Sequence, residues 1–236
     1  MTKDTPIDHV SVASIREAIG TAILVFVGCT GCIGSLGVHP SLMQISLAFG
    51  LGAMIAIQCI GHISGAHINP SITVAALILG RVSLPMTFLY ICSQCIGGLI
   101  GFGLIRVNHR SILTLQLPYQ VIAGAMAEVL ATGLLVFFAC GLWDCRNAAN
   151  TDSVPMRLGF CITVLCLIFI PYTGCSLNPA RTLGPAIWNG YWTNHWVFWI
   201  GPIGGAIVFN AFSVLSSSNE KMILALHPAK FVSFSE

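Results

Sequence analysis

The chain has 236 residues, of which 56% are hydrophobic and only 8% are charged. An ordinary soluble domain carries about 25% charged residues, so this composition excludes a protein with a fully water-facing surface. The formal net charge of +2 excludes the strongly basic surface of a nucleic-acid-binding protein, and no nucleic-acid partner is expected. The composition therefore predicts a polytopic membrane protein in a lipid bilayer.

Several apolar stretches are long enough to cross a hydrocarbon core of roughly 30 Å. Polar or Pro/Gly-containing connections separate them. The N-terminal segment 1–11 is polar and lacks a cleavable signal pattern, so the first span is expected to be retained. The segment from Ser216 onward, 217–236 included, is polar and is expected to be mobile. The predicted spans are 15–34, 43–61, 86–107, 121–142, 157–173 and 196–216.

Two further apolar pieces, NPSITVAALILG (69–80) and NPARTLGPAIWNG (178–190), are too short to be spans. About 11 helical residues extend only about 16 Å at 1.5 Å per residue. Each piece opens with Asn followed by Pro, which is a favoured start for a helix. We predict two re-entrant half-helices, because such segments are tolerated at membrane depth when they are buried in protein or face water.

The chain contains an internal repeat. REAIGTAILVFVGC (16–29) aligns with AEVLATGLLVFFAC (127–140), SGAHINPSIT (64–73) with TGCSLNPART (173–182), and CIGGLIGF (95–102) with PIGGAIVF (202–209). The offsets are 111, 109 and 107 residues. Each half has three spans and one half-helix, so the second copy inserts upside down. The predicted fold is an all-α membrane protein with six spans and two half-helices, forming one channel domain over 1–236 with repeats at about 12–107 and 121–216.

Positive charge in the connections predicts the orientation. An even number of spans places both termini on one side, and cytoplasmic loops are enriched in Lys and Arg. With both termini inside, two basic residues, Arg106 and Arg110, face outward. The cytoplasmic set is larger: Lys3, Arg16, Arg81, Arg146, Arg157, Lys221 and Lys230.

In an inverted repeat the two half-helices meet N-terminus to N-terminus. Each N-terminus has unpaired N–H groups and about half a positive charge, and Asn69 and Asn178 add side-chain amides. This combination can hold the oxygen of a neutral solute and repel cations, including protons. Arg181 follows three residues after Asn178, and a charge at such depth is expected to be functional.

The segments SGAHINPS (64–71) and TGCSLNPARTLGPA (173–186) together resemble the paired Asn-Pro-Ala boxes of the aquaporin, or major intrinsic protein, family. Ser71 departs from the usual Ala, with little effect expected because this position packs and does not line the pore. The resemblance implies a homotetramer with one pore per subunit, and we expect it in the plasma membrane. The matching motif residues are Asn69, Pro70, Ser71, Asn178, Pro179 and Ala180.

The resemblance also implies roles for the residues around each box. Glu17 and Glu128 occupy equivalent repeat positions, near the starts of the first and fourth spans, where they accept hydrogen bonds from the irregular backbone before each half-helix. A proton relay is the alternative. His62 and His67 are expected to line the cytoplasmic vestibule without gating or metal binding. A ladder of backbone carbonyls is expected at Gly65, Ala66, His67, Gly174, Cys175 and Ser176.

The constriction of the family falls on Phe49, Cys166, Cys175 and Arg181. Water-selective members usually have His at the position of Cys166, and CITVLCLIFIPYTGC (161–175) contains no His. Ordinary glycerol-conducting members have Asp where this chain has Thr182, and they lack the aromatic pair matched by Phe198 and Trp199. This combination resembles the insect entomoglyceroporins, whose filter His is replaced by a small residue.

The sequence thus favours a passive channel for water and small uncharged solutes such as glycerol and urea. A strictly water-selective channel is the alternative. A secondary transporter would also use inverted repeats, but both acids were placed near span ends, away from a coupling site. A membrane thiol enzyme is suggested by ten cysteines but lacks a nearby base. No enzymatic activity, cofactor or metal is expected, and the glycine pairs Gly97/Gly101 and Gly201/Gly205 predict close helix crossings.

Overall fold

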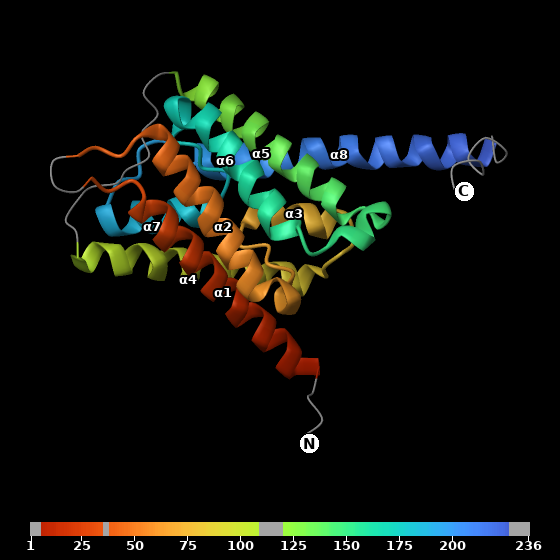
Figure 1. Ribbon diagram of the computed structural model, residues 1–236, viewed down its shortest axis with the longest axis horizontal. Helices are drawn as coiled ribbons and strands as arrows, with labels where there is room; N and C mark the ends of the chain where they lie inside the picture. The colour runs from red at the N-terminus through yellow and green to blue at the C-terminus, as the bar shows by residue number, and fades with distance from the viewer. Residues whose placement is uncertain (1–5, 35–37, 109–119, 227–236) are drawn as a thin grey trace.

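The computed structural model describes residues 6–34, 38–108 and 120–226 (Figure 1). Within these ranges the secondary-structure elements are helices. The long helices are α1 (Pro6–Thr30), α2 (Leu42–Ser64), α4 (Leu84–Asn108), α5 (Val121–Trp143), α6 (Val154–Thr173) and α8 (Val197–Leu226). The short ones are α3 (Pro70–Ile78), the 3-10 helix η1 (Cys145–Asn150) and α7 (Pro179–Asn189).

Six of these helices are long and apolar enough to cross a membrane. They are α1, α2, α4, α5, α6 and α8, and they correspond one by one to the six predicted spans. The predicted half-helices are also confirmed, because α3 has 9 residues and α7 has 11. The chain is therefore an integral, multi-pass membrane protein.

The outer helices differ from the predicted spans at three ends. Helix α1 begins at Pro6, earlier than the predicted 15, and ends at Thr30, earlier than the predicted 34. Helix α8 continues to Leu226, beyond the predicted end of the last span at 216, while its apolar part ends at Leu215. Hydropathy marks the part of a helix that lies in lipid, while backbone hydrogen bonds carry the helix beyond it. Of the predicted polar ends 1–11 and 217–236, residues 1–5 and 227–236 lie outside the described residues, with Lys3 and Lys230 among them. The loop residue Arg110 also lies outside them.

The half-helices pack across the two halves of the chain. Helix α1 packs on α2 and α4, α5 packs on α6 and α8, and α2 packs on α6. Helix α3 contacts α8 and helix α7 contacts α4, so each half-helix reaches into the opposite half. In Figure 1 residues 38–41, which lead into α2, lie at the left, whereas η1 and the last turns of α8 lie at the right.

Glycines permit the closest helix crossings. A Cβ added at Gly97 would stand 2.2 Å from the carbonyl oxygen of Ala18, and one at Gly205 would stand 2.3 Å from that of Val129. Contacts this short would force the α1/α4 and α5/α8 pairs apart, so glycine is required there. The close crossings predicted from the two glycine pairs are confirmed.

Candidate functional site

The N-termini of α3 and α7 are each capped by an asparagine. Asn69 Oδ1 accepts a hydrogen bond of 2.9 Å from the backbone N–H of Ser71. Asn178 Oδ1 accepts from the N–H groups of Ala180 at 3.0 Å and Arg181 at 3.3 Å. In each helix the next residue is a proline, whose missing N–H costs nothing at the first helical position: Pro70 in α3 and Pro179 in α7.

The same two asparagines tie the halves of the chain together. Asn69 Nδ2 donates to the carbonyl of Leu177 at 2.8 Å, and Asn178 Nδ2 donates to the carbonyl of Ile68 at 2.8 Å. Each amide thus bonds the residue just before the other asparagine. The two half-helix N-termini therefore meet at one point, with both asparagines almost fully buried.

The backbone leading into each half-helix follows an unusual path. Left-handed conformations are rare outside glycine because Cβ meets the carbonyl oxygen, at a cost of roughly 1–2 kcal/mol per residue. Here they recur in both segments, so the backbone changes direction repeatedly before each half-helix. The residues with positive φ are Gly65 (83°), Ala66 (48°) and Ile68 (46°) in the first segment, and Gly174 (78°), Cys175 (51°) and Leu177 (56°) in the second.

Two fully buried carboxylates hold these strained segments. Glu17 accepts hydrogen bonds from the backbone N–H groups of His67 at 3.0 Å and Ile68 at 2.7 Å. Glu128 accepts from those of Ser176 at 2.8 Å and Leu177 at 3.0 Å. Because α1 begins at Pro6, Glu17 lies near the middle of its helix, and its predicted position near the start of a span is wrong.

Gln94 of α4 is a polar residue of the site that the sequence analysis missed. Its Nε2 donates to Glu17 Oε2 at 2.8 Å and to Thr73 Oγ1 at 2.9 Å, and its side chain is fully buried. Tyr90, one turn earlier, donates from its hydroxyl to the carbonyl of Ser64 at 2.8 Å. The available signal was an amide within the uncharged run 82–105.

One cavity joins most of the predicted site residues. Gly174 of the predicted carbonyl ladder does not line the cavity, and neither does His62, which was predicted for the vestibule. The motif residues Pro70, Ser71, Pro179 and Ala180 are buried behind the lining. At the end away from the constriction the cavity is bordered by Leu142, Trp143, Val154 and Leu158. The predicted residues in the lining are Phe49, Gly65, Ala66, His67, Asn69, Cys166, Cys175, Ser176, Asn178 and Arg181.

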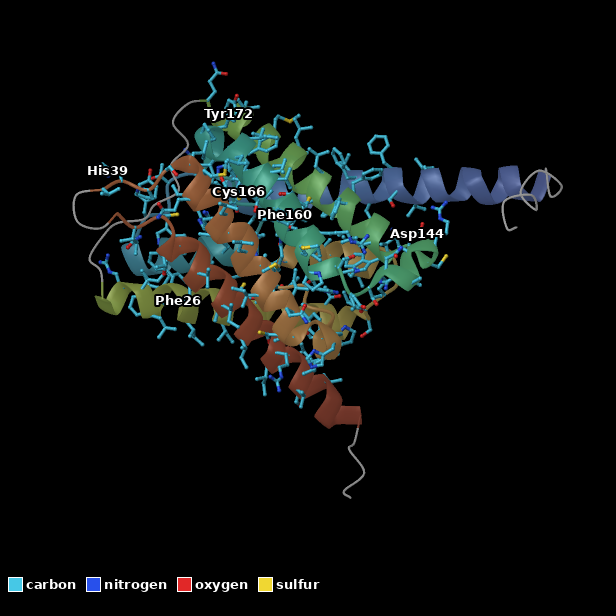
Figure 2. All side chains as sticks on the ribbon, in the orientation of Figure 1. Phe26, His39, Asp144, Phe160, Cys166 and Tyr172 are labelled. Atoms are coloured by element: carbon cyan, nitrogen blue, oxygen red, sulfur yellow. The ribbon has the colours of Figure 1, made fainter. Side chains whose placement is uncertain are left out.

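The four residues predicted for the constriction lie together. The guanidinium carbon of Arg181 stands 4.5 Å from the centre of the Phe49 ring, and Arg181 Nη2 donates to the carbonyl of Gly174 at 3.4 Å. The Cys166 and Cys175 side chains are both buried and line the same cavity. In Figure 2, Cys166 lies between His39, at the left of the view, and Asp144, at the right.

Arg181 retains hydrogen-bonding capacity. It is almost fully buried, and its Nε and Nη1 have no partner among the described residues. A buried donor without a protein partner is normally satisfied by water or by a ligand. Since Arg181 borders the cavity and bonds a carbonyl, its remaining donors are suited to the oxygen of a solute.

These features define a multi-pass membrane protein in which two re-entrant half-helices meet at a central cavity. Comparison with known proteins agrees with this class. The model of the major intrinsic protein family matches residues 8–212, and the chain belongs to this family.

Individual relatives support the assignment. The chain is 37% identical over 146 residues to aquaporin-4 of Mus musculus, covering 59% of this chain and 45% of that protein. It is 35% identical over 231 residues to aquaporin PIP2-1 of Arabidopsis thaliana, covering 91% of this chain and 70% of that protein. The matched region is thus less than half the length of the mouse relative.

A solved structure shares the fold. The X-ray structure of the aquaglyceroporin from Plasmodium falciparum matches with a TM-score of 0.70, covering 86% of this chain and 95% of that chain. The sequences are 21% identical, so this likeness concerns the arrangement of the helices alone.

Proposed function

We propose that this chain is a passive channel for water and small uncharged solutes, glycerol and urea among them, and that it excludes protons and ions. The observation that carries the proposal is the meeting of two half-helix N-termini on one cavity, with Asn69, Asn178 and Arg181 in its lining. All three present nitrogen donors, which are suited to the oxygen of an uncharged solute.

Ion exclusion follows from the charges in this arrangement. Each half-helix contributes roughly +0.5 elementary charge at its N-terminus, and Arg181 adds a full positive charge at the constriction. A cation in the lumen meets this potential after losing part of its water shell, whereas a neutral molecule does not. Water at the two asparagines accepts hydrogen bonds from both, which opposes an unbroken proton-conducting chain.

The solute range depends on the constriction. Phe49 supplies an apolar wall, while Arg181 and the carbonyl of Cys175 supply polar partners. A linear polyol passes such a site with its carbon edge on the aromatic ring and its hydroxyls on the polar side. The small Cys166 thiol leaves space that an imidazole would occupy, which favours glycerol in addition to water.

We also propose a homotetramer in the plasma membrane, with one pore per subunit and both termini in the cytoplasm. The excess of Lys and Arg in the corresponding connections supports the orientation. The outer surface carries an apolar band that suits lipid and neighbouring subunits. On α1 and α4 this band includes Ile19, Ile96, Ile100 and Leu104, all between 43% and 54% exposed.

The test is swelling and shrinking of vesicles that contain the purified protein, with water and glycerol gradients compared side by side. We expect both permeabilities to exceed those of empty vesicles, without added electrical conductance. Water permeability without glycerol permeability would establish the alternative, a strictly water-selective channel. Neither permeability above the empty vesicles would contradict the channel proposal.

A further inference from the structure

An aromatic cluster borders the cavity at the end away from the constriction. Trp143, the last residue of α5, lines the cavity together with His67, Val154 and Leu158. The Trp143 and His67 ring centres are 5.9 Å apart, with an interplanar angle of 49°. His67 also meets the ring of Tyr90 edge-on at 5.4 Å. An indole and an imidazole thus stand side by side at this mouth.

Arg81 holds the indole from the connection between α3 and α4. Its Nη1 donates to the backbone carbonyl of Trp143 at 3.2 Å, and its guanidinium carbon lies 5.3 Å from the centre of the Trp143 ring. The two contacts fix both the backbone and the ring of one residue. A guanidinium stacks on an aromatic face and bonds a carbonyl at once, which lysine cannot reproduce.

Side-chain hydrogen bonds also fix the segment that follows Trp143. Asp144 accepts hydrogen bonds from the backbone N–H of Arg146 at 2.9 Å and from its Nη2 at 2.7 Å. The Arg146 guanidinium holds the pKa of Asp144 below its usual range, so this carboxylate stays charged at neutral pH. Asn147 Nδ2 donates to the carbonyl of Gly141 at 2.7 Å. Trp143 is therefore positioned from both sides of its own backbone.

The two ends of the cavity differ in chemistry. The constriction combines Phe49 with the charged donors of Arg181, whereas the far mouth combines Trp143 and the His67 imidazole with the apolar Val154 and Leu158. A rigidly held indole in such a wall takes up cross-section and offers a passing hydroxyl little hydrogen bonding on its ring faces. A solute that is too large to pass the constriction easily is therefore hindered a second time at this mouth.

We propose that Trp143 is a size-determining residue of a second constriction, and that Arg81 is the positioning residue that holds its indole across the mouth. The proposal rests on the proposed channel function. It predicts that the upper size limit for polyols is set at this mouth as well as at the constriction of Phe49, Cys166, Cys175 and Arg181.

The experiment compares Trp143→Ala and Trp143→Phe with wild type in vesicles, using water, glycerol, erythritol and ribitol. We expect Trp143→Ala to raise erythritol and ribitol permeability relative to water by about tenfold, comparable to the discrimination that one methylene gives in a fitted pocket. Trp143→Phe keeps a smaller ring, so its polyol permeabilities relative to water are expected to lie between those of wild type and Trp143→Ala. Trp196→Ala, an exposed tryptophan outside the cavity lining, is the matched control and should match wild type.

Arg81 is tested by coupling. Arg81→Gln alone is expected to shift the size profile part of the way toward that of Trp143→Ala. In the Trp143→Ala background the same change should add nothing, because the side chain that Arg81 positions is gone. Equal effects of Arg81→Gln in both backgrounds would overturn the positioning role.

The outcomes separate this proposal from the channel proposal. Water flux with an unchanged polyol profile in Trp143→Ala and Trp143→Phe would overturn the second constriction and leave the channel intact. A wild type that conducts poorly, with Trp143→Ala opening it, would support the constriction. If neither the wild type nor Trp143→Ala conducts water or polyols, the channel proposal is contradicted, and the second constriction with it. If Trp143→Ala does not elute as a folded species in size-exclusion chromatography, Trp143→Phe alone decides.

Discussion

The two re-entrant segments, 64–78 and 173–189, share one backbone design and differ in the side chains that complete it. Both have left-handed residues, a buried glutamate that accepts two backbone N–H groups, and an asparagine that bonds the opposite segment. The shared parts place the half-helices. The differences lie in how many hydrogen bonds hold each segment and in which segment carries the donors that we propose discriminate between solutes.

Around the first segment, the long polar side chains of α1 and α4 bond one another and Thr73. Gln94 bridges Glu17 and Thr73, and His67 Nδ1 lies 3.2 Å from Thr73 Oγ1. In the second segment Arg181 bonds only a carbonyl at long distance, and its Nε and Nη1 have no partner among the described residues. The comparison shows that charged donors remain uncommitted on one side only, at the proposed constriction.

The largest expected effect is loss of folding when either glutamate is removed. Each buried N–H that loses its acceptor costs about 1–3 kcal/mol. Glu17→Ala removes the acceptor of the Ser64 hydroxyl and one of the two acceptors of Gln94 Nε2, in addition to that of two backbone groups. It should therefore lower the thermal unfolding temperature of detergent-purified protein more than Glu128→Ala, which leaves one hydroxyl, that of Thr173. Unchanged unfolding temperatures would show that the segments hold their shape without these carboxylates.

The next effect concerns charge. Arg181→Val removes the only full charge that lines the cavity in the described part of the chain, and we expect it to leave a folded, water-conducting pore with a measurable cation or proton leak. Electrical recording and proton-flux assays on vesicles measure this leak. Arg106→Gln, which removes a cation outside the cavity lining, is the control. Persistent water flow without added conductance in Arg181→Val would remove Arg181 from the barrier.

A smaller effect is expected from thiol modification. Cys166 and Cys175 line the cavity, so a small mercurial should slow water flow through the wild type. The double Cys→Ser variant should resist it, whereas Cys59→Ser, which changes an exposed cysteine, should remain sensitive. Equal inhibition of the double variant would assign the reactive thiol elsewhere. Cys32, which interacts electrostatically with Arg181, would be the next candidate.

The sequence predicted the parts of the fold that leave local signals. Long apolar runs predicted the six spans, and the Asn-Pro openings at Asn69 and Asn178 predicted where the half-helices begin. The start of α1 and the end of α8 were mispredicted because each helix continues beyond its apolar stretch. Hydropathy marks the apolar stretch and not the end of the helix.

Several site residues could not be predicted because their roles depend on contacts between distant segments. Gln94 is a lone amide in apolar sequence, and only the packing of α4 against α1 brings it to Glu17. Ala66, Ile68 and Leu177 adopt left-handed conformations that their residue types do not favour. The contact of Arg81 with Trp143 joins residues 62 positions apart, so no local sequence pattern predicts it.

The most direct test of solute discrimination at the proposed constriction is the ratio of glycerol to water permeability in matched vesicles, wild type against Cys166→His. An imidazole at 166 would crowd the polyol between Phe49 and Arg181. A hydroxyl left unpaired there costs roughly 1–3 kcal/mol, and each 1.36 kcal/mol is tenfold in rate. We predict that Cys166→His lowers the ratio by about tenfold to a hundredfold while largely sparing water. An unchanged ratio, or a wild type that excludes glycerol from the start, would contradict the account.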